Sequence, residues 1–180
     1  MPIKNTVTKM LLASVLSSVV NLIATLIVNI VITFRSAASQ TVAAVFLAIL
    51  SPIVFSIMLV YLLHVYRANG EGDVWDDYPE IYGGVAKDIS KIIKRERYTL
   101  LLIISVSAAN LLLWILNHAL LHISILDAIT LIFSTMFSLH SLFPYTIFGQ
   151  CLGYASGAVL TCIIYVITFA LFRWKWRRFM

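Results

Sequence analysis

Two histidines four residues apart, His118 and His122, are the residues whose types and spacing most readily suggest chemistry. On one helix their imidazoles would share a face, where they could bind Zn²⁺ or haem, or relay protons. Zinc needs further ligands, and Asp127 or His140 could supply one, but the spacing fits no standard zinc signature. Haem needs axial ligands on opposite sides of its ring, and His64, near the inner end of the second span, lies too far along its helix to partner His118. We therefore expect no metal site and no cofactor.

His118, His122 and Asp127 follow an uncharged stretch that begins at Tyr98. A helix rises about 1.5 Å per residue, so His118 comes about 30 Å after Tyr98, which is the thickness of a bilayer core. These three side chains are therefore expected at the far membrane boundary, where water and headgroups solvate them. His140 lies among serines and threonines, and it either hydrogen bonds to them inside a helical bundle or contacts a substrate or proton.

Polar residues form a stripe in each of two apolar stretches. The first stripe is Ser14, Ser18, Asn21, Thr25 and Asn29, and the second is Ser107, Asn110, Trp114, His118 and His122. Steps of three and four keep each set on one helix face. Because lipid-facing asparagine is costly, we expect the two faces to meet each other or a common cavity. They serve either as helix–helix contacts or as walls of a hydrophilic pathway, for which the candidates are Asn21, Asn29, Asn110, His118, His122, Asp127 and His140.

The elements that hold these residues are expected to be membrane helices. Of the 180 residues, 61% are hydrophobic and 12% are charged, and the mean hydropathy is +0.97. Soluble domains are about 45–50% apolar and about 25% charged, and a soluble fold of this length could not bury so much apolar surface. The sequence therefore predicts one integral membrane domain over residues 1–180, with Cys151 and Cys162 as membrane-buried thiols.

Four uncharged stretches are long enough to cross a hydrocarbon core, which takes about 20 helical residues. They are Met10–Phe34, Val42–Tyr66, Tyr98–Asn117 and Leu152–Phe172. We expect an all-α polytopic membrane bundle with four full spans and a re-entrant or interfacial segment between the last two. Pro144 and the Gly149–Gln150 pair would break the helix there. Five spans are the alternative, because the chain from Tyr98 to Phe172 has room for three crossings.

Residues 67–97 are the only long polar stretch and are expected to form a cytoplasmic loop. The first part is acidic, and it either pairs with the basic part, docks a basic partner or holds a cation. The second part places valine and isoleucine at helical spacing among cations, which is typical of an amphipathic helix on an anionic membrane surface. The expected membrane-surface residues are Lys87, Lys91, Lys94, Arg95 and Arg97.

Clustered cations predict the orientation in the membrane. The thirteen lysines and arginines divide into two before the first span, one in the first link, six in the middle loop and four after the last span. Basic segments flanking spans stay in the cytoplasm. Four spans place twelve of the thirteen on that side, so we expect a multi-pass protein of the cell membrane with a cytoplasmic N-terminus.

Gly153, Gly157 and Thr161 place small residues four apart in the last span. Such a ladder lets a neighbouring backbone approach closely, either within the chain or between chains. The expected partner is the lipid bilayer, and other membrane subunits or a second copy of the chain remain open. Nucleic-acid binding is not expected, because no aromatic-rich basic domain stands outside the spans.

The predicted function is transport. The sequence has no glycine-rich phosphate loop and no nucleophile–base pair at a recognised spacing, so we do not expect an enzyme. A channel, a carrier or the membrane subunit of a larger transporter would use a polar path between spans one and three. The alternative is a non-transporting partner protein, such as an assembly, regulatory or immunity factor, that acts through the cytoplasmic loop. Transport requires the asparagine faces to meet water, whereas the alternative requires them to be dry and mutually bonded.

Overall fold

The structure is a computed structural model, and the residues it describes are helical nearly throughout. They comprise 3–32, 37–65, 89–90, 92–94, 96–121, 123–126, 130, 140 and 142–177. The long helices are α1 (Ile3–Ile32), α2 (Ala37–Val60), α4 (Arg97–Leu116) and α6 (Ile147–Arg177). Five-residue π-helices, η1 (Tyr61–Val65) and η2 (Asn117–Leu121), continue α2 and α4. No strand occurs among these residues, which confirms the all-α prediction.

Four helices in the described part of the chain are long and apolar enough to cross a membrane. The apolar stretches are Val7–Ile27, Val42–Leu63, Arg97–Ala119 and Ile147–Phe172. Each one overlaps a stretch that the sequence predicted to span. These helices are those of a multi-pass membrane protein. The expected re-entrant segment falls mostly on residues outside the described ranges.

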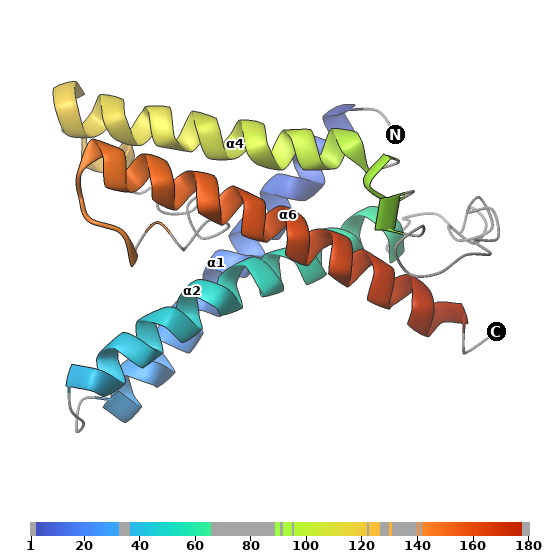
Figure 1. The fold of residues 1–180 in the computed structure, drawn as a ribbon, viewed down its shortest axis with the longest axis horizontal. Helices are drawn as coiled ribbons and strands as arrows, with labels where there is room; N and C mark the ends of the chain where they lie inside the picture. Colours follow the sequence, from blue (N-terminus) through green and yellow to red (C-terminus); the bar gives the residue numbers. More distant parts are fainter. Residues whose placement is uncertain are drawn as a thin grey trace.

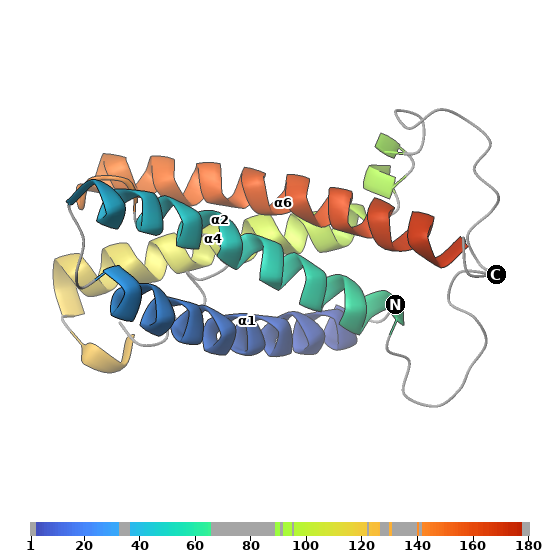
Figure 2. The same cartoon turned by 90° about the horizontal axis from the view of Figure 1, so that it is seen from below.

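Consecutive long helices run in opposite directions (Figures 1 and 2). The first residue of α1, the end of η1, the first residue of α4 and the last residue of α6 lie at one end of the bundle, called here the terminal end. The opposite end, where α1 and α4 finish and α2 and α6 begin, is called the hairpin end. In Figure 1 the α1–α2 pair crosses the α4–α6 pair and separates from it toward the hairpin end.

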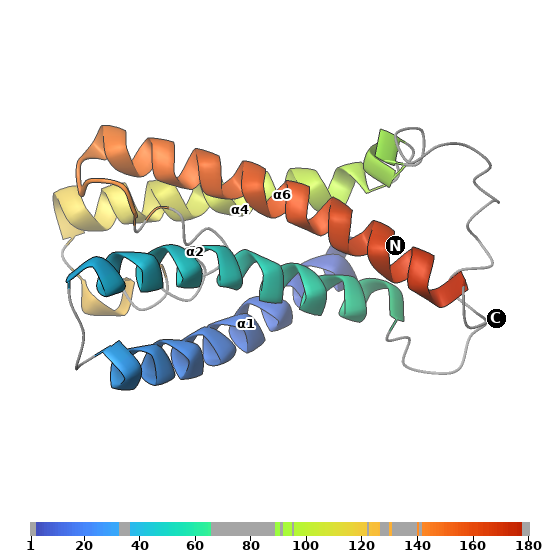
Figure 3. The ribbon, with the colours of Figure 1, turned by 60° about the horizontal axis from the view of Figure 1, so that its bottom comes forward.

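By their contacts the helices pack in the order α1, α2, α6, α4, so α2 and α6 form the centre. In Figure 3, α2 lies between α1 and the α4–α6 pair. The core comprises Phe55, Leu59 and Val60 of α2, Leu63 of η1, Ile103 of α4, and Tyr154, Tyr165 and Phe169 of α6. The outward faces of the helices carry exposed leucine, isoleucine and valine, as expected for surfaces that meet lipid.

α1 and α4 share no substantial contact, so their polar stripes do not pack against each other. This differs from the sequence-based expectation of a shared face. Of the α1 stripe, Ser14 is fully buried, and Ser17 beside the stripe donates from Oγ to the main-chain oxygen of Ser51 in α2 at 3.4 Å. The stripe of α4 is turned toward α6 instead. Stripe spacing defines which side chains share a helix face, but it does not identify the helix that covers that face.

α6 begins at Ile147 and passes through Gly149 and Gln150 without a break. Thr146 explains this start, because its Oγ1 accepts a hydrogen bond from the Gly149 main-chain N–H at 3.1 Å. This is the N-cap pattern, in which a side-chain oxygen accepts from the main-chain N–H three residues later. The prediction of a break at Gly149–Gln150 was therefore wrong, and the irregular chain ends before Ile147, after Pro144.

Candidate functional site

Buried polar residues line the contact between α4 and α6 over most of its length. We call these eight residues the polar seam: Glu96, Thr99, Ser107 and Asn110 at the start of and along α4, and Gln150, Tyr154, Thr161 and Tyr165 of α6. Their spacing within each helix is three, four, seven or eight residues, so each set stays on one face. Apolar residues surround them in the core. The seam is therefore a polar strip enclosed by apolar packing.

Asn110 lies in the middle of the seam and is 2% exposed. Its Nδ2 donates to the main-chain oxygen of Thr130 at 3.3 Å and to Tyr154 Oη at 3.5 Å. Ser107, one turn earlier, donates from Oγ to the main-chain oxygen of Tyr154 at 3.1 Å. Within the part of the chain that the structure describes, Asn110 Oδ1 is buried and has no hydrogen-bond partner.

His140 and Gln150 complete this part of the seam. The His140 ring stacks on the Tyr154 ring, with centroids 4.7 Å apart and an interplanar angle of 18°. Gln150 Nε2 donates to the main-chain oxygens of His140 at 3.4 Å and Pro144 at 3.3 Å. Gln150 is fully buried, and its Oε1 has no hydrogen-bond partner among the described residues. The Gln150 amide therefore attaches the chain around His140 to α6 and leaves its oxygen unsatisfied.

Two glycines make this close approach possible. A Cβ at Gly153 would lie 2.6 Å from His140 Cα, and a Cβ at Gly149 would lie 2.4 Å from the Pro144 oxygen. Both distances are too short for any other residue without a backbone shift. The sequence singled out Gly153, Gly157 and Thr161 as a packing face, and all three are buried. It missed Gly149, which continues that face one turn earlier.

A buried carboxylate marks the terminal end of the seam. Glu96 is 7% exposed, and its Oε2 accepts hydrogen bonds from Tyr165 Oη at 2.9 Å and Thr99 Oγ1 at 3.1 Å. Glu96 directly precedes α4, where the helix dipole favours negative charge. Sequence reasoning missed this residue because it stands in a run of cations. The available signal was an acid directly before a long span, with threonine three residues later.

The other predicted path residues lie away from the seam. Asn21 is half-buried on α1, with its Oδ1 unpartnered within the described residues. Asn29 lies in α1, and its side chain is outside the described part. The exposed His118 lies in η2 at the hairpin end, stacked on Trp114 at 5.0 Å. His122 and Asp127 are outside the described residues. Of the seven candidates, the seam therefore contains only Asn110, and His140 lies against it through Tyr154.

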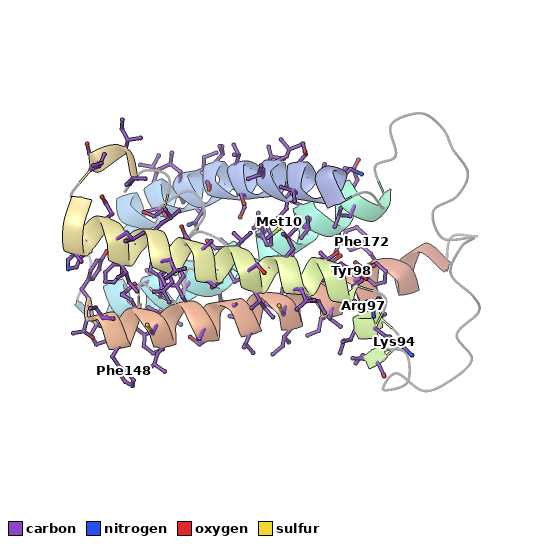
Figure 4. The ribbon with its side chains drawn as sticks, turned by 90° about the horizontal axis from the view of Figure 1, so that it is seen from above. Met10, Lys94, Arg97, Tyr98, Phe148 and Phe172 are labelled. Carbon is purple, nitrogen blue, oxygen red and sulfur yellow. The ribbon has the colours of Figure 1, made fainter. Side chains whose placement is uncertain are left out.

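Of the expected membrane-surface residues, Lys94 and Arg97 are described, and both are exposed at the terminal end (Figure 4). The Arg97 guanidinium lies 4.7 Å from the centre of the Tyr98 ring and donates to Tyr98 Oη at 2.9 Å. Ile92 is buried in the core, whereas Ile93 and Lys94 are exposed. Lys87, Lys91 and Arg95 lie outside the described residues.

Neither metal-ligand geometry among the described residues nor comparison with known proteins assigns a role to the seam. No group of three or more His, Cys, Asp or Glu in the described ranges is placed to hold a metal ion. Comparison of the chain with protein-family models, curated proteins and solved structures gives no match. Inferences about function therefore depend on the geometry and chemistry of the seam itself.

Proposed function

We propose that this protein is a small transport-type membrane protein whose polar route follows the seam between α4 and α6. The observation that carries the proposal is the buried, unsatisfied oxygen of Asn110. An unpaired buried acceptor costs about 1–3 kcal/mol in a protein interior, and lipid offers no donor to compensate it at membrane depth. A leucine would pack there without that cost, so the amide is better explained by a solute or water that reaches it.

The unpaired atoms of the α1–α2 contact carry less weight. They include the hydroxyls of Ser14 and Ser51, which have no partner among the described residues. A serine hydroxyl can rotate and bond to a carbonyl one turn earlier in its own helix, as Ser18 Oγ does to the Ser14 main-chain oxygen at 2.9 Å. The oxygen of a fixed amide has no such alternative. Asn21 Oδ1 of α1 is also unpartnered among the described residues, but Asn21 is only half-buried. The proposed route therefore follows α4 and α6 and not the space between spans one and three.

Cysteine accessibility in intact vesicles tests this proposal. In a background of Cys151→Ala and Cys162→Ala, single cysteines replace Ser107 or Asn110 in the seam. Matched controls replace Leu112 and Val159, which are 60% and 59% exposed on the outward faces of α4 and α6. We expect the seam thiols to react with a membrane-impermeant cationic thiosulfonate faster than the controls, because only hydrated thiols ionise and react. Equal and negligible labelling at all four positions would contradict a solute route.

The second candidate function is a non-transporting partner protein. It is favoured by the bonds that several seam residues make to one another, such as Tyr165 to Glu96 and Ser107 to Tyr154. In that case the seam only joins α4 to α6, and residues 67–97 contact the partner. Loss of partner co-purification after deletion of residues 71–80, with unlabelled seam thiols, would favour this candidate.

A further inference from the structure

We infer that the solute carried along the seam is a small monovalent cation. This inference rests on the proposed transport function and adds the class of solute to it. The two unsatisfied side-chain atoms of the seam are both amide oxygens, Asn110 Oδ1 and Gln150 Oε1. An amide oxygen accepts hydrogen bonds or coordinates a cation, and it cannot donate.

The orientation of both amides is fixed by their neighbours. Asn110 faces the Thr130 carbonyl, and Gln150 faces the carbonyls of His140 and Pro144. Carbonyl oxygens accept only, so each amide must present its NH₂ group to them. Rotating either amide by 180° would place oxygen against oxygen. The fold therefore directs two electron-rich atoms into the seam.

The charges around the seam favour a cation over an anion. No lysine or arginine occurs between Tyr98 and Phe172, so no fixed positive charge within that stretch could stabilise an anion. At the terminal end the Glu96 carboxylate is buried and held by Tyr165 and Thr99. A cation that has passed the exposed Lys94 and Arg97 at that end would meet the Glu96 carboxylate before the neutral oxygens of the seam.

The ligands also favour a monovalent over a divalent ion. Mg²⁺ releases its water reluctantly, and Ca²⁺ sites gain affinity from several carboxylates. The described seam offers one carboxylate, with neutral amide and hydroxyl oxygens beyond it. Na⁺, K⁺ and ammonium share the required chemistry, and measurement must separate them. The two amide oxygens are buried, so an ion would reach them only after neighbouring side chains rearrange.

The test uses the full chain, purified and reconstituted into liposomes. Initial uptake is measured with ²²Na⁺, ⁸⁶Rb⁺ as a K⁺ substitute, ¹⁴C-methylammonium, ³⁶Cl⁻ and ³H-mannitol, and a pH-sensitive dye records proton flux. We expect uptake of at least one of the three cation tracers and no uptake of chloride or mannitol. The tracer that is taken up identifies which of Na⁺, K⁺ and ammonium is the solute.

Glu96→Gln provides the matched variant. Glutamine retains an oxygen that accepts from Tyr165 and Thr99 but removes the charge. We expect the initial rate of cation uptake to fall about tenfold, as for the loss of one charge interaction in a partly buried site. Glu80→Gln removes the same charge from the acidic stretch of the sequence and should leave uptake unchanged. Equal thermal unfolding midpoints in detergent will show that both variants are folded.

The outcomes separate the solute class from the transport function. Chloride or mannitol uptake that Asn110→Leu abolishes and Leu112→Ala spares would overturn the cation class and leave the transport function standing. Proton flux without uptake of any of the three cation tracers would exclude Na⁺, K⁺ and ammonium as the solute and leave the transport function standing. Absence of every flux would overturn both. If Glu96→Gln leaves cation uptake unchanged, the Glu96 carboxylate takes no part in attracting the cation.

Discussion

Tyr154 makes three different contacts with two other parts of the chain. Its main-chain oxygen accepts from Ser107, its hydroxyl accepts from Asn110, and its ring stacks on His140. It is also 2% exposed, so little of its surface meets lipid. One residue of α6 thereby connects α4 with the chain around His140, and changes to its ring and its hydroxyl should have separable effects.

Tyr154→Phe removes only the hydroxyl and its 3.5 Å contact with Asn110. We expect the free energy of unfolding to fall by about 0.5–1.5 kcal/mol, the net value of one ordinary hydrogen bond. Tyr154→Ala also removes the ring and should cost about 3–5 kcal/mol. Unfolding in mixed micelles with increasing dodecyl sulfate measures both. Tyr145→Phe, at a residue that is largely exposed, is the control; a similar loss there would contradict a specific role for the seam hydroxyl.

Gly153→Ala should force the chain around His140 away from α6. The added methyl group would lie 2.6 Å from His140 Cα, and the nearest atom is backbone, which cannot rotate aside. Overpacking of this kind costs about 1–3 kcal/mol. The same micelle titration measures the loss. Ala155→Val enlarges an exposed position two residues along α6 and should change the stability little; equal stability of the two variants would show that the approach at Gly153 is not tight.

At the scale of the helices, the apolar stretches predicted their positions well. The third span was expected at Tyr98–Asn117, and α4 occupies Arg97–Leu116. This accuracy has a physical basis, because a span is defined by the absence of charge over a fixed length. The helix that covers each polar face was not predictable in the same way. It depends on contacts between distant residues, such as Gly153 with His140, that leave no periodic signal.

The start of α6 should depend on Thr146. Thr146→Ala removes the acceptor of the Gly149 N–H and should cost about 1 kcal/mol, the usual value of an N-cap. Hydrogen–deuterium exchange should then quicken at Gly149 and Gln150, and remain slow beyond Tyr154. Ser156→Ala removes a hydroxyl bonded within the helix, to the Gly153 oxygen, and is the matched control. Unchanged exchange at Gly149 would mean that another group caps the helix.

At the scale of the whole molecule, two helix pairs are joined through α2 and α6. The beginning of α1 and the end of α6 lie at the same end of the bundle (Figures 2 and 3). Labels attached at the two ends of the chain should therefore be modified from the same side of a sealed vesicle. Protease protection of one label alone would favour the five-span alternative.

The limited contact of α1 has a consequence for how the protein is made. α1 packs on α2 and η1, which follow it directly in the sequence. The first hairpin can therefore assemble while the ribosome is still synthesising the middle of the chain. The contact between α4 and α6 must wait until α6 has emerged, because it joins Glu96 to Tyr165 across 69 residues. During that interval the polar face of α4 is uncovered in the translocon, where substitutions of Ser107 or Asn110 would be exposed to quality control.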